Sequence, residues 1–363
     1  MNKSKKVYVA MSGGVDSSVA AALLLKQGYN VIGVFMKQWS ANRNNTFCIW
    51  KEERKEAIRA AISLGIPLKT WDFTKEYKKL VADYMIKEYR SGKTPNPDVM
   101  CNKEIKFGLF LNRAIKEGAD YVATGHYVRK IKSKKSNLPG LTSARPRAGK
   151  SSEWGLYQGV DKNKDQSYFL WTLTKKEVEK CLFPIGGYTK PDVRKLAKKF
   201  RLPNADKKDS QGVCFIGPLD VKDFLASQIK KKSGDIIKDG KKIGTHDGAY
   251  YYTIGQRHGL DIKSGAGPFY VIDKDIKKNI IYVGNEKDLL KDKAVVTDFS
   301  WVNGPINLPA TLDVKIRYRT KSQKAKISKN GGLKFKKPVR AITSGQSAVF
   351  YKGERLLGGG IIK

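Results

Sequence analysis

Short apolar runs alternate with longer stretches of helical periodicity over the first 125 residues. The pattern predicts strands at 6–11, 30–36 and 120–125 and helices at 17–28, 51–65, 74–92 and 102–119. Alternating units of this length predict an α/β fold with a parallel sheet and helices on both faces. Ligands of such sheets bind beyond the carboxyl ends of the strands.

The pattern changes after a further predicted helix at 191–200. From about residue 215, short aromatic or β-branched segments are separated by Gly, Asp and Asn. After residue 291 alternation becomes regular, with a turn signal at Asn330-Gly331. We therefore predict three domains, namely a parallel-sheet domain at 1–213, a small mixed connector at 214–290 and a β-barrel at 291–363.

Residues 130–152 interrupt this organisation. They are rich in Lys, Arg, Ser, Gly and Pro and have almost no apolar content, which predicts an exposed, mobile loop. Connection alone is its simplest role, and contact with RNA phosphates is the alternative.

Composition narrows the functional classes. An apolar fraction of 40% is enough for ordinary cores, so global disorder is not expected. Lys and Arg number 71 against 34 Asp and Glu, giving a net charge of +37, and such a field attracts polyanions. A generally lysine-rich proteome would give the same excess of positive charge.

The N-terminus enters a predicted strand almost at once, and no apolar run reaches 18 residues. A cytoplasmic location, away from membranes, is expected.

The segment MSGGVDSS (11–18) lies between the first predicted strand and helix. Its two glycines permit a tight turn, and its serines lie at a helix N-terminus, where the dipole favours anions. No GK[ST] follows, so this is not a Walker A loop. A carboxylate such as Asp16 beside phosphates calls for a cation, which points to Mg²⁺. An ordinary glycine turn with serine caps is the alternative.

Four cysteines occur without any CxxC pair, which argues against a zinc knuckle or a disulfide framework. Cys101 follows the stiff stretch PNPDVM. If a helix begins near Asn102, its dipole together with Lys103 and Lys106 would lower the pKa of the thiol. Burial as a small apolar residue is the equal alternative. Cys214 lies at a loop-to-strand junction in KKDSQGVCFIG, whereas Cys48 and Cys181 have apolar neighbours typical of packing.

Several motifs occur in order along the chain, among them MSGGVDSS, GVFMKQW, TPNPDVMCNKEIKFG, ATGHYVR, KDQSYFL, KKDSQGVCFIG, YTIGQRHGL and GQSAVFY. Together they closely resemble the bacterial tRNA-specific 2-thiouridylase (MnmA) family from end to end. The departures are the basic insertion near 133–152 and Gln211 beside Gly212. The resemblance implies a Rossmann-like N-terminal domain of the adenine nucleotide alpha hydrolase type, with a pyrophosphatase loop.

The implied activity is ATP-dependent 2-thiolation of the wobble uridine, U34, in tRNAs for lysine, glutamate and glutamine. By resemblance, Cys101 is the nucleophile, Cys214 carries a persulfide from an upstream cysteine desulfurase or sulfur relay protein, and Asp98 serves acid–base catalysis. The implied ATP-binding residues are Ala10, Met11, Ser12, Gly13, Gly14, Val15, Asp16, Ser17, Ser18, Met36 and Gly125. The implied tRNA-binding residues are Asn96, Pro97, Asp98, His126, Lys164, Asp165, Gln166, Arg317, Tyr318 and Gln346.

Alternatives remain for the barrel contacts and for the mechanism. On an alternating strand, RYR (317–319) would direct Arg317 and Arg319 to one face, suited to phosphates or simply to solvent. Asp98, Cys101 and Cys214 could instead ligate an iron–sulfur cluster. Two other functions compete with thiolation. The protein could be another AMP-forming ligase with the same loop, or a non-catalytic RNA-binding protein.

Overall fold

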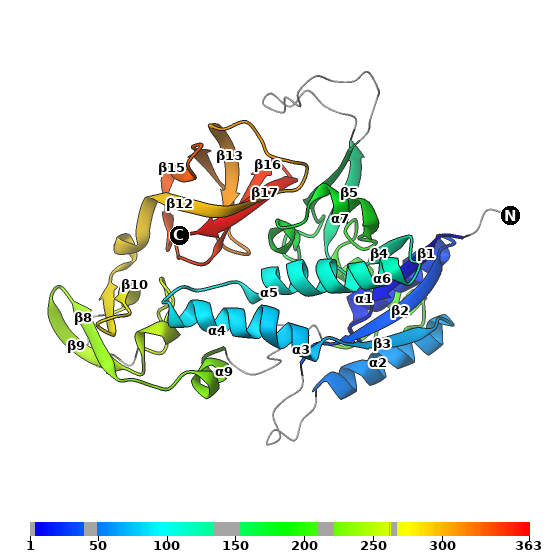
Figure 1. Cartoon of the computed structure of the whole chain (residues 1–363), viewed down its shortest axis with the longest axis horizontal. Coiled ribbons are helices and arrows are strands. Elements are labelled where there is room, and N and C mark those ends of the chain that lie inside the picture. Colours follow the sequence, from blue (N-terminus) through cyan, green and yellow to red (C-terminus); the bar gives the residue numbers. More distant parts are fainter. Residues whose placement is uncertain (1–3, 40–48, 134–152, 209–220, 261, 263–266) are drawn as a thin grey trace.

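The computed structural model describes residues 4–39, 49–133, 153–208, 221–260, 262 and 267–363. Figure 1 shows the N-terminal parallel sheet on one side of the molecule and the barrel and central sheet on the other. Helices α4 and α6 lie between them. Among the described residues, no helix has the length and apolar character needed to cross a bilayer.

The N-terminal sheet is parallel throughout, in the order β3-β2-β1-β4-β7. Its strands are β1 (Lys6–Ala10), β2 (Asn30–Lys37), β3 (Leu68–Asp72), β4 (Tyr121–Ala123) and β7 (Cys181–Leu182). Alternate residues of β1 face opposite layers, as strand geometry requires. Val7 and Val9 share a core with α1 (Val15–Lys26) and α2 (Ile49–Leu64), whereas Tyr8 joins the core of the other face. The predicted α/β sandwich is confirmed.

The other face is covered by two long helical segments, each with a π-helical insertion. The first comprises α3 (Thr74–Tyr77), η1 (Lys78–Ala82) and α4 (Asp83–Arg90), and the second comprises α5 (Pro97–Met100), η2 (Cys101–Phe110) and α6 (Leu111–Lys116). The second segment begins at Pro97 rather than near Asn102, so that expectation was wrong. Asn96 caps it, because its side-chain oxygen accepts hydrogen bonds from the backbone N–H groups of Asp98 (3.1 Å) and Val99 (3.3 Å).

A hairpin links this domain to the barrel. Strands β5 (Val128–Ser133) and β6 (Glu153–Gln158) pair with each other, and β6 pairs with β17 of the barrel. Residues 130–133 therefore belong to a strand and not to a loop, which corrects the expectation for that part of 130–152. The remainder, 134–152, lies outside the described residues. The domain is completed by η3 (Ser167–Leu170), α7 (Lys175–Lys180) and α8 (Lys190–Lys199).

The central domain contains a four-stranded sheet in the order β10-β11-β8-β9. Its elements are α9 (Val221–Gln228), β8 (Gly234–Lys238), β9 (Lys241–His246), η4 (Ala249–Tyr251), β10 (Tyr270–Asp275) and β11 (Ile280–Gly284). A short helix, η5 (Glu286–Leu289), leads into the barrel.

Six antiparallel strands form the C-terminal barrel, and the pairing of β12 with both β15 and β17 closes it. The strands are β12 (Leu290–Trp301), β13 (Ala310–Lys315), β14 (Gln323–Ile327), β15 (Gly332–Arg340), β16 (Ser347–Lys352) and β17 (Arg355–Ile362). The barrel interior is apolar, with Phe335 and Phe350 among its buried residues. The expected barrel is confirmed. Strand β13 ends at Lys315, however, so residues 317–319 form a turn and the expected alternation of Arg317 and Arg319 was wrong.

Candidate functional site

The phosphate loop follows β1 at the carboxyl edge of the parallel sheet. It is braced by its own hydroxyls: Ser17 Oγ accepts from the N–H of Ser12 (3.2 Å) and donates to the carbonyl of Gly14 (3.0 Å). Ser18 Oγ donates to the same carbonyl at 3.1 Å. The loop is thus preformed at the start of α1, where backbone N–H groups and the helix dipole favour an anion.

Two glycines allow close packing around this loop. Gly13 has a φ of +76°, and a Cβ there would lie 2.2 Å from the carbonyl oxygen of Glu53. Gly125, just after β4, would place a Cβ 2.7 Å from the backbone nitrogen of Ser17. Neither position can hold a side chain without displacing backbone, which explains both glycines physically. Gly125 therefore lies against the loop.

Asp16 is the charged centre of the loop. Its Oδ1 accepts a hydrogen bond from the hydroxyl of Tyr127 at 2.8 Å and forms an ion pair with Lys190 Nζ at 2.7 Å. The cation beside Asp16 in this structure is therefore a lysine side chain from the first residue of α8. Sequence reasoning assigned neither Tyr127 nor Lys190 to the site.

A second pair of side chains holds Gly13 from the far side of the loop. Asn204 Nδ2 donates to the Gly13 carbonyl (3.1 Å) and to Ser18 Oγ (3.0 Å), and Lys207 Nζ donates to the same carbonyl at 3.3 Å. Asn204 is only 2% exposed. Burial raises the pKa of Glu53, whose backbone packs on Gly13, and the charge of Lys207 opposes this shift.

The remaining predicted ATP residues lie at the same sheet edge. Met36 is the penultimate residue of β2, opposite Trp71 of β3, and Ala10 is the last residue of β1. Met11 and Val15 are buried. The fold therefore brings the predicted ATP residues to one edge, as expected for a ligand of a parallel sheet.

Cys101 lies near this edge but is buried, with 1% of its surface exposed. It follows α5 directly and so lies beyond the first turn of its helix. The amide of Gln38, the residue after β2, contacts its sulfur at 3.8 Å. Burial raises the pKa of the Cys101 thiol, and the opposing effect of Lys106 does not reverse this. The expectation of a lowered pKa was therefore wrong in this state, because desolvation of the thiolate outweighs the effect of Lys106.

The other cysteines divide between described and undescribed residues. Cys181 is buried in β7, which confirms its packing role. Cys214 and Cys48 lie outside the described residues. The distance between Cys101 and Cys214 is therefore not given by this structure, and their pairing stays a prediction.

The loop before Cys101 is held by the barrel and the central domain. The backbone N–H of Thr94 donates to the carbonyl of Ser344 (2.9 Å), and Gln346 Nε2 donates to the carbonyl of Thr94 (2.8 Å). Thr94 Oγ1 also lies 3.3 Å from Thr253 Oγ1. Residues of all three domains therefore meet at Thr94, two positions before the helix cap Asn96. Gln346, predicted to contact tRNA, is engaged here with the loop.

His126 is buried three residues after the end of β4. Its Nδ1 lies 2.7 Å from Thr124 Oγ1, and its ring packs on Phe107 and Phe183. Burial lowers the pKa of His126 well below its usual value, so the ring is neutral. Only 6% of the residue is exposed, and its contact with tRNA stays a prediction.

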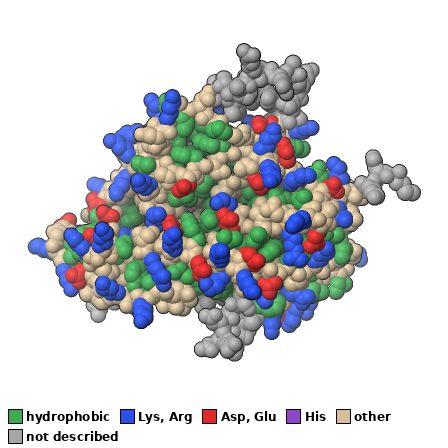
Figure 2. All heavy atoms as spheres, in the orientation of Figure 1, with side chains coloured by type: hydrophobic (Ala, Val, Ile, Leu, Met, Phe, Trp, Pro, Cys, Tyr) green, Lys and Arg blue, Asp and Glu red, His purple; other side chains and the backbone are tan. Residues whose placement is uncertain are grey.

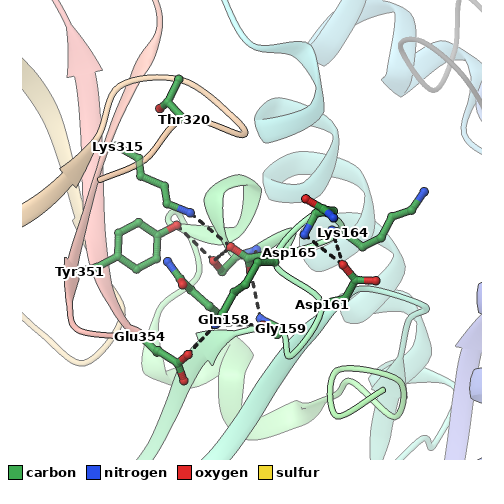
Figure 3. A network of polar contacts seen from close by, with 12 residues as sticks. Gln158, Gly159, Asp161, Lys164, Asp165, Lys315, Thr320, Tyr351 and Glu354 are labelled. Carbon is green, nitrogen blue, oxygen red and sulfur yellow. Dashed lines mark hydrogen bonds and ion pairs between the residues drawn. The ribbon is translucent and has the colours of Figure 1, made fainter. Parts of the chain in front are cut away.

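Lys164 ends a turn, and Asp165 and Gln166 lead from it into η3; Figure 3 shows Lys164 and Asp165 in a network of polar contacts that reaches Lys315 and Tyr351 of the barrel. Asp165 accepts hydrogen bonds from Gly159 N (3.0 Å) and Ser167 Oγ (3.0 Å) and pairs with Lys315 Nζ of β13 at 3.5 Å. Gln166 Oε1 accepts from the N–H of Tyr127 at 3.0 Å. The three residues thus lie at the domain junction, and Gln166 orients the tyrosine that contacts Asp16.

The barrel residues predicted to bind tRNA lie in the same region. The guanidinium of Arg317 donates to the carbonyl of Ile254 (2.6 Å) and to Thr343 Oγ1 (2.8 Å). Tyr318 packs on Phe169, with 4.4 Å between ring centroids. Burial lowers the pKa of Arg317, whose hydrogen bonds join the barrel to the central domain.

Of the missed residues, Tyr127 lies within ATGHYVR and Lys207 opens KKDSQGVCFIG, whereas Lys190 and Asn204 lie outside the recognised motifs. Lys190 did have one local signal, since the stretch TKPD (189–192) is a capping box with proline in the first turn. That pattern indicates a helix N-terminus, though not its proximity to Asp16. The described residues contain no cluster of three or more His, Cys, Asp or Glu side chains arranged to hold a metal.

Known proteins match the chain over nearly its whole length. Family models described as the tRNA methyl transferase HUP domain, the tRNA methyl transferase PRC-barrel domain and the aminomethyltransferase beta-barrel domain match residues 5–218, 222–285 and 291–362. The tRNA-specific 2-thiouridylases MnmA of Bacillus licheniformis and Bacillus subtilis are each 45% identical to it, covering 98% of this chain and 94% of their own. The Staphylococcus aureus protein of the same name is 44% identical, over 99% of this chain and 96% of its own. The chain therefore belongs to the tRNA-specific 2-thiouridylase MnmA family.

Proposed function

We propose that this protein forms 2-thiouridine at the wobble position of tRNA, at the expense of ATP. The observation that carries the proposal is the convergence of the Ser12–Ser18 loop and the helix of Cys101 on one edge of the parallel sheet. Near full-length identity of 45% to relatives named as tRNA 2-thiouridylases supports the same activity.

In the first step the phosphates of ATP bind the loop between β1 and α1. The C2 oxygen of uridine 34 attacks the α-phosphorus, and the bond to the bridging oxygen breaks with its electron pair going to pyrophosphate. The oxygen at C2 is then part of an AMP leaving group. Loop N–H groups and the α1 dipole would stabilise the negative charge of the phosphates.

In the second step the terminal sulfur of a persulfide on Cys214 attacks C2, and AMP leaves with the former C2 oxygen. The Cys101 thiolate then attacks Sγ of Cys214 in the Cys214–S–S–C2 adduct. The S–S bond breaks with its electron pair going to the sulfur on C2, which yields 2-thiouridine and a Cys101–Cys214 disulfide for an external thiol to reduce. The thiolate is the attacking form, so Cys101 must lose its proton despite the burial that raises its pKa. Asp98, half-buried one turn before Cys101, is assigned the acid–base role.

We assign the target base to the Asn96–Asp98 corner, where the helix begins. Uridine 34 must leave the anticodon stack to reach it. The wider tRNA surface would use His126, Lys164, Asp165 and Gln166, with Arg317, Tyr318 and Gln346 from the barrel. Figure 2 shows Lys and Arg side chains distributed widely over the face in view, which suits a polyanion. An upstream persulfide donor, a desulfurase or relay protein, is the second partner.

Mg²⁺ and an iron–sulfur cluster differ in how well the described residues suit them. Mg²⁺ is commonly held by one or two carboxylates together with substrate phosphates, and Asp16 beside the loop serines fits that chemistry. Bound there, the ion would neutralise phosphate charge. For a cluster, the described residues supply Asp98 and Cys101, and the third predicted ligand, Cys214, lies outside them. The persulfide mechanism needs no cluster, and we build no step on one.

The test incubates the protein with unmodified lysine tRNA, ATP, Mg²⁺ and a persulfide donor, followed by nucleoside mass spectrometry. We expect 2-thiouridine, AMP and pyrophosphate, and no product from a tRNA with cytidine at position 34. Cys101→Ser and Cys214→Ser should abolish thiolation, whereas Cys181→Ala should retain it. AMP release with intact product from both serine variants would favour another AMP-forming ligase. Binding of tRNA without any AMP release would favour a non-catalytic RNA-binding protein.

Anaerobic purification with iron and acid-labile sulfide analysis separates the two sulfur mechanisms. An active preparation that lacks both iron and acid-labile sulfide excludes the cluster. Loss of thiolation on iron removal, with recovery on reconstitution, would overturn the persulfide mechanism.

A further inference from the structure

The side chain of Lys190 crosses from α8 to the phosphate loop. Its Nζ lies 2.7 Å from Asp16 Oδ1, and only 11% of the side chain is exposed, against 32% for Asp16. Tyr127 donates to the same carboxylate oxygen at 2.8 Å. An ammonium held at this depth is costly to desolvate, and the carboxylate offsets that cost.

The backbone of Lys190 is held in place at the start of α8. Thr189 and Asp192 form a capping box at the start of α8, and the N–H of Lys190 donates to Asp161 Oδ2 at 3.0 Å. Helices α8 and α1 also share a buried apolar cluster, in which Val193 and Ala197 join Val15 and Val19. The N-termini of the two helices are therefore held in a fixed relation, and the position of the ammonium follows from it.

A negative charge inside a phosphate-binding loop opposes its ligand. A phosphate bound on the loop and the Asp16 carboxylate would repel each other. The ion pair with Lys190 removes this repulsion. An ammonium can donate three hydrogen bonds, so it can hold a carboxylate and a phosphate oxygen at the same time.

We propose that Lys190 is a phosphate-binding residue of this site, which neutralises Asp16 in the free protein and contacts the β- and γ-phosphates when ATP is bound. The nucleotide's identity rests on the proposed function, whereas the charge argument rests on the geometry of Asp16 and Lys190. When the α-phosphorus is attacked, the ammonium lies beside the charge that develops on the leaving pyrophosphate. A lysine so placed stabilises that charge without moving.

The test compares Lys190→Met with Lys190→Arg, which keeps the positive charge. The control is Lys195→Met, an exposed lysine on the same helix. Isothermal titration calorimetry with ATP, inorganic pyrophosphate and adenosine, each with Mg²⁺ and with EDTA, measures equilibrium binding without any need for thiolation. Thermal unfolding of every variant establishes that it is folded.

We expect Lys190→Met to weaken ATP and pyrophosphate binding about tenfold or more, as loss of a charged hydrogen bond does. Adenosine affinity should be unchanged, Lys190→Arg should recover most of the loss, and Lys195→Met should match the parent protein. Parent-like pyrophosphate affinity in Lys190→Met, or an equal loss for adenosine, would overturn the proposal. If the variants show the expected binding pattern but the parent protein makes no 2-thiouridine, the proposed function is wrong and the role of Lys190 in phosphate binding still holds.

Discussion

The side-chain amide of Gln346 donates a hydrogen bond of 2.8 Å to the backbone carbonyl of Thr94, and so joins the barrel to the loop that leads to Cys101. The two residues are 252 positions apart in sequence. The neighbouring Gly345 has a φ of +87°, and a Cβ there would lie 3.0 Å from the backbone of Thr94. The barrel therefore helps to fix the geometry of the loop that precedes Cys101.

Replacement of Gln346 by alanine should lower the rate of thiolation more than the affinity for tRNA. Without the amide, the loop before the Asn96 cap loses one of its anchors, and misplacement of Asp98 or Cys101 by a fraction of an ångström costs about tenfold in kcat. Single-turnover rates and filter binding of tRNA separate the two effects. Gln323→Ala, at an exposed position on β14, is the matched control. A parent-like rate combined with weakened tRNA binding would contradict the positioning role and favour direct contact.

The central features of the fold could be predicted because they are local. The apolar run of β1 is followed by Gly13 and Gly14 and then by a helix, and together these indicate a phosphate loop without tertiary information. The ion pair of Lys190 with Asp16 joins residues 174 positions apart, and nothing near either residue indicates the other. Local sequence can indicate a helix N-terminus, but it does not give the packing of α8 on α1.

Burial explains the principal error at the site. The prolines indicate a stiff approach to Cys101 and the nearby lysines favour a lowered pKa, but the pKa of its thiol depends on what covers it. Tyr77 and Phe107 share its buried core, and both lie in helical segments with π-helical insertions that residue propensities do not distinguish from α-helix. The pairing of β6 with β17 was missed for a similar reason, because strand partners across domains leave no local pattern.

Cys101 should react slowly with iodoacetamide at neutral pH in the free protein. Burial raises the pKa of this thiol above the usual value of 9.0. Its thiolate fraction, and with it the rate of alkylation, should therefore still rise with pH where the rate for an exposed thiol has become constant. Peptide-resolved mass spectrometry of the alkylated protein measures this rate. Protein unfolded in urea is the control and should titrate as an ordinary thiol. Rapid labelling of native Cys101 at pH 7 would contradict the burial of the thiol in solution.

His126 should make the protein less stable in acid. Because burial lowers its folded pKa well below 6.5, the unfolded chain binds more protons in the interval between the two pKa values. The free energy of unfolding is therefore unaffected by this group above its unfolded pKa and falls as pH drops below 6.5. The slope approaches about 1.4 kcal/mol per pH unit. Urea unfolding at a series of pH values measures it.

His126→Gln should remove this contribution to the slope, whatever its effect on stability at neutral pH. Identical slopes for the parent and His126→Gln would mean that His126 is accessible to protons in the folded state.

Gly125→Ala should disturb the phosphate loop without touching any ATP-binding side chain. The added methyl group would lie 2.7 Å from the carbonyl carbon of Asp16 and from the nitrogen of Ser17, both backbone atoms that cannot move aside alone. The Ser17 N–H lies in the first turn of α1, where backbone N–H groups favour an anion. We therefore expect ATP affinity to fall about tenfold, which corresponds to the free energy of a charged hydrogen bond. Gly187→Ala is the control, because a Cβ there meets nothing within 4 Å. Calorimetric titration with ATP compares the two, and equal affinities in folded proteins would show that Gly125 does not constrain the loop.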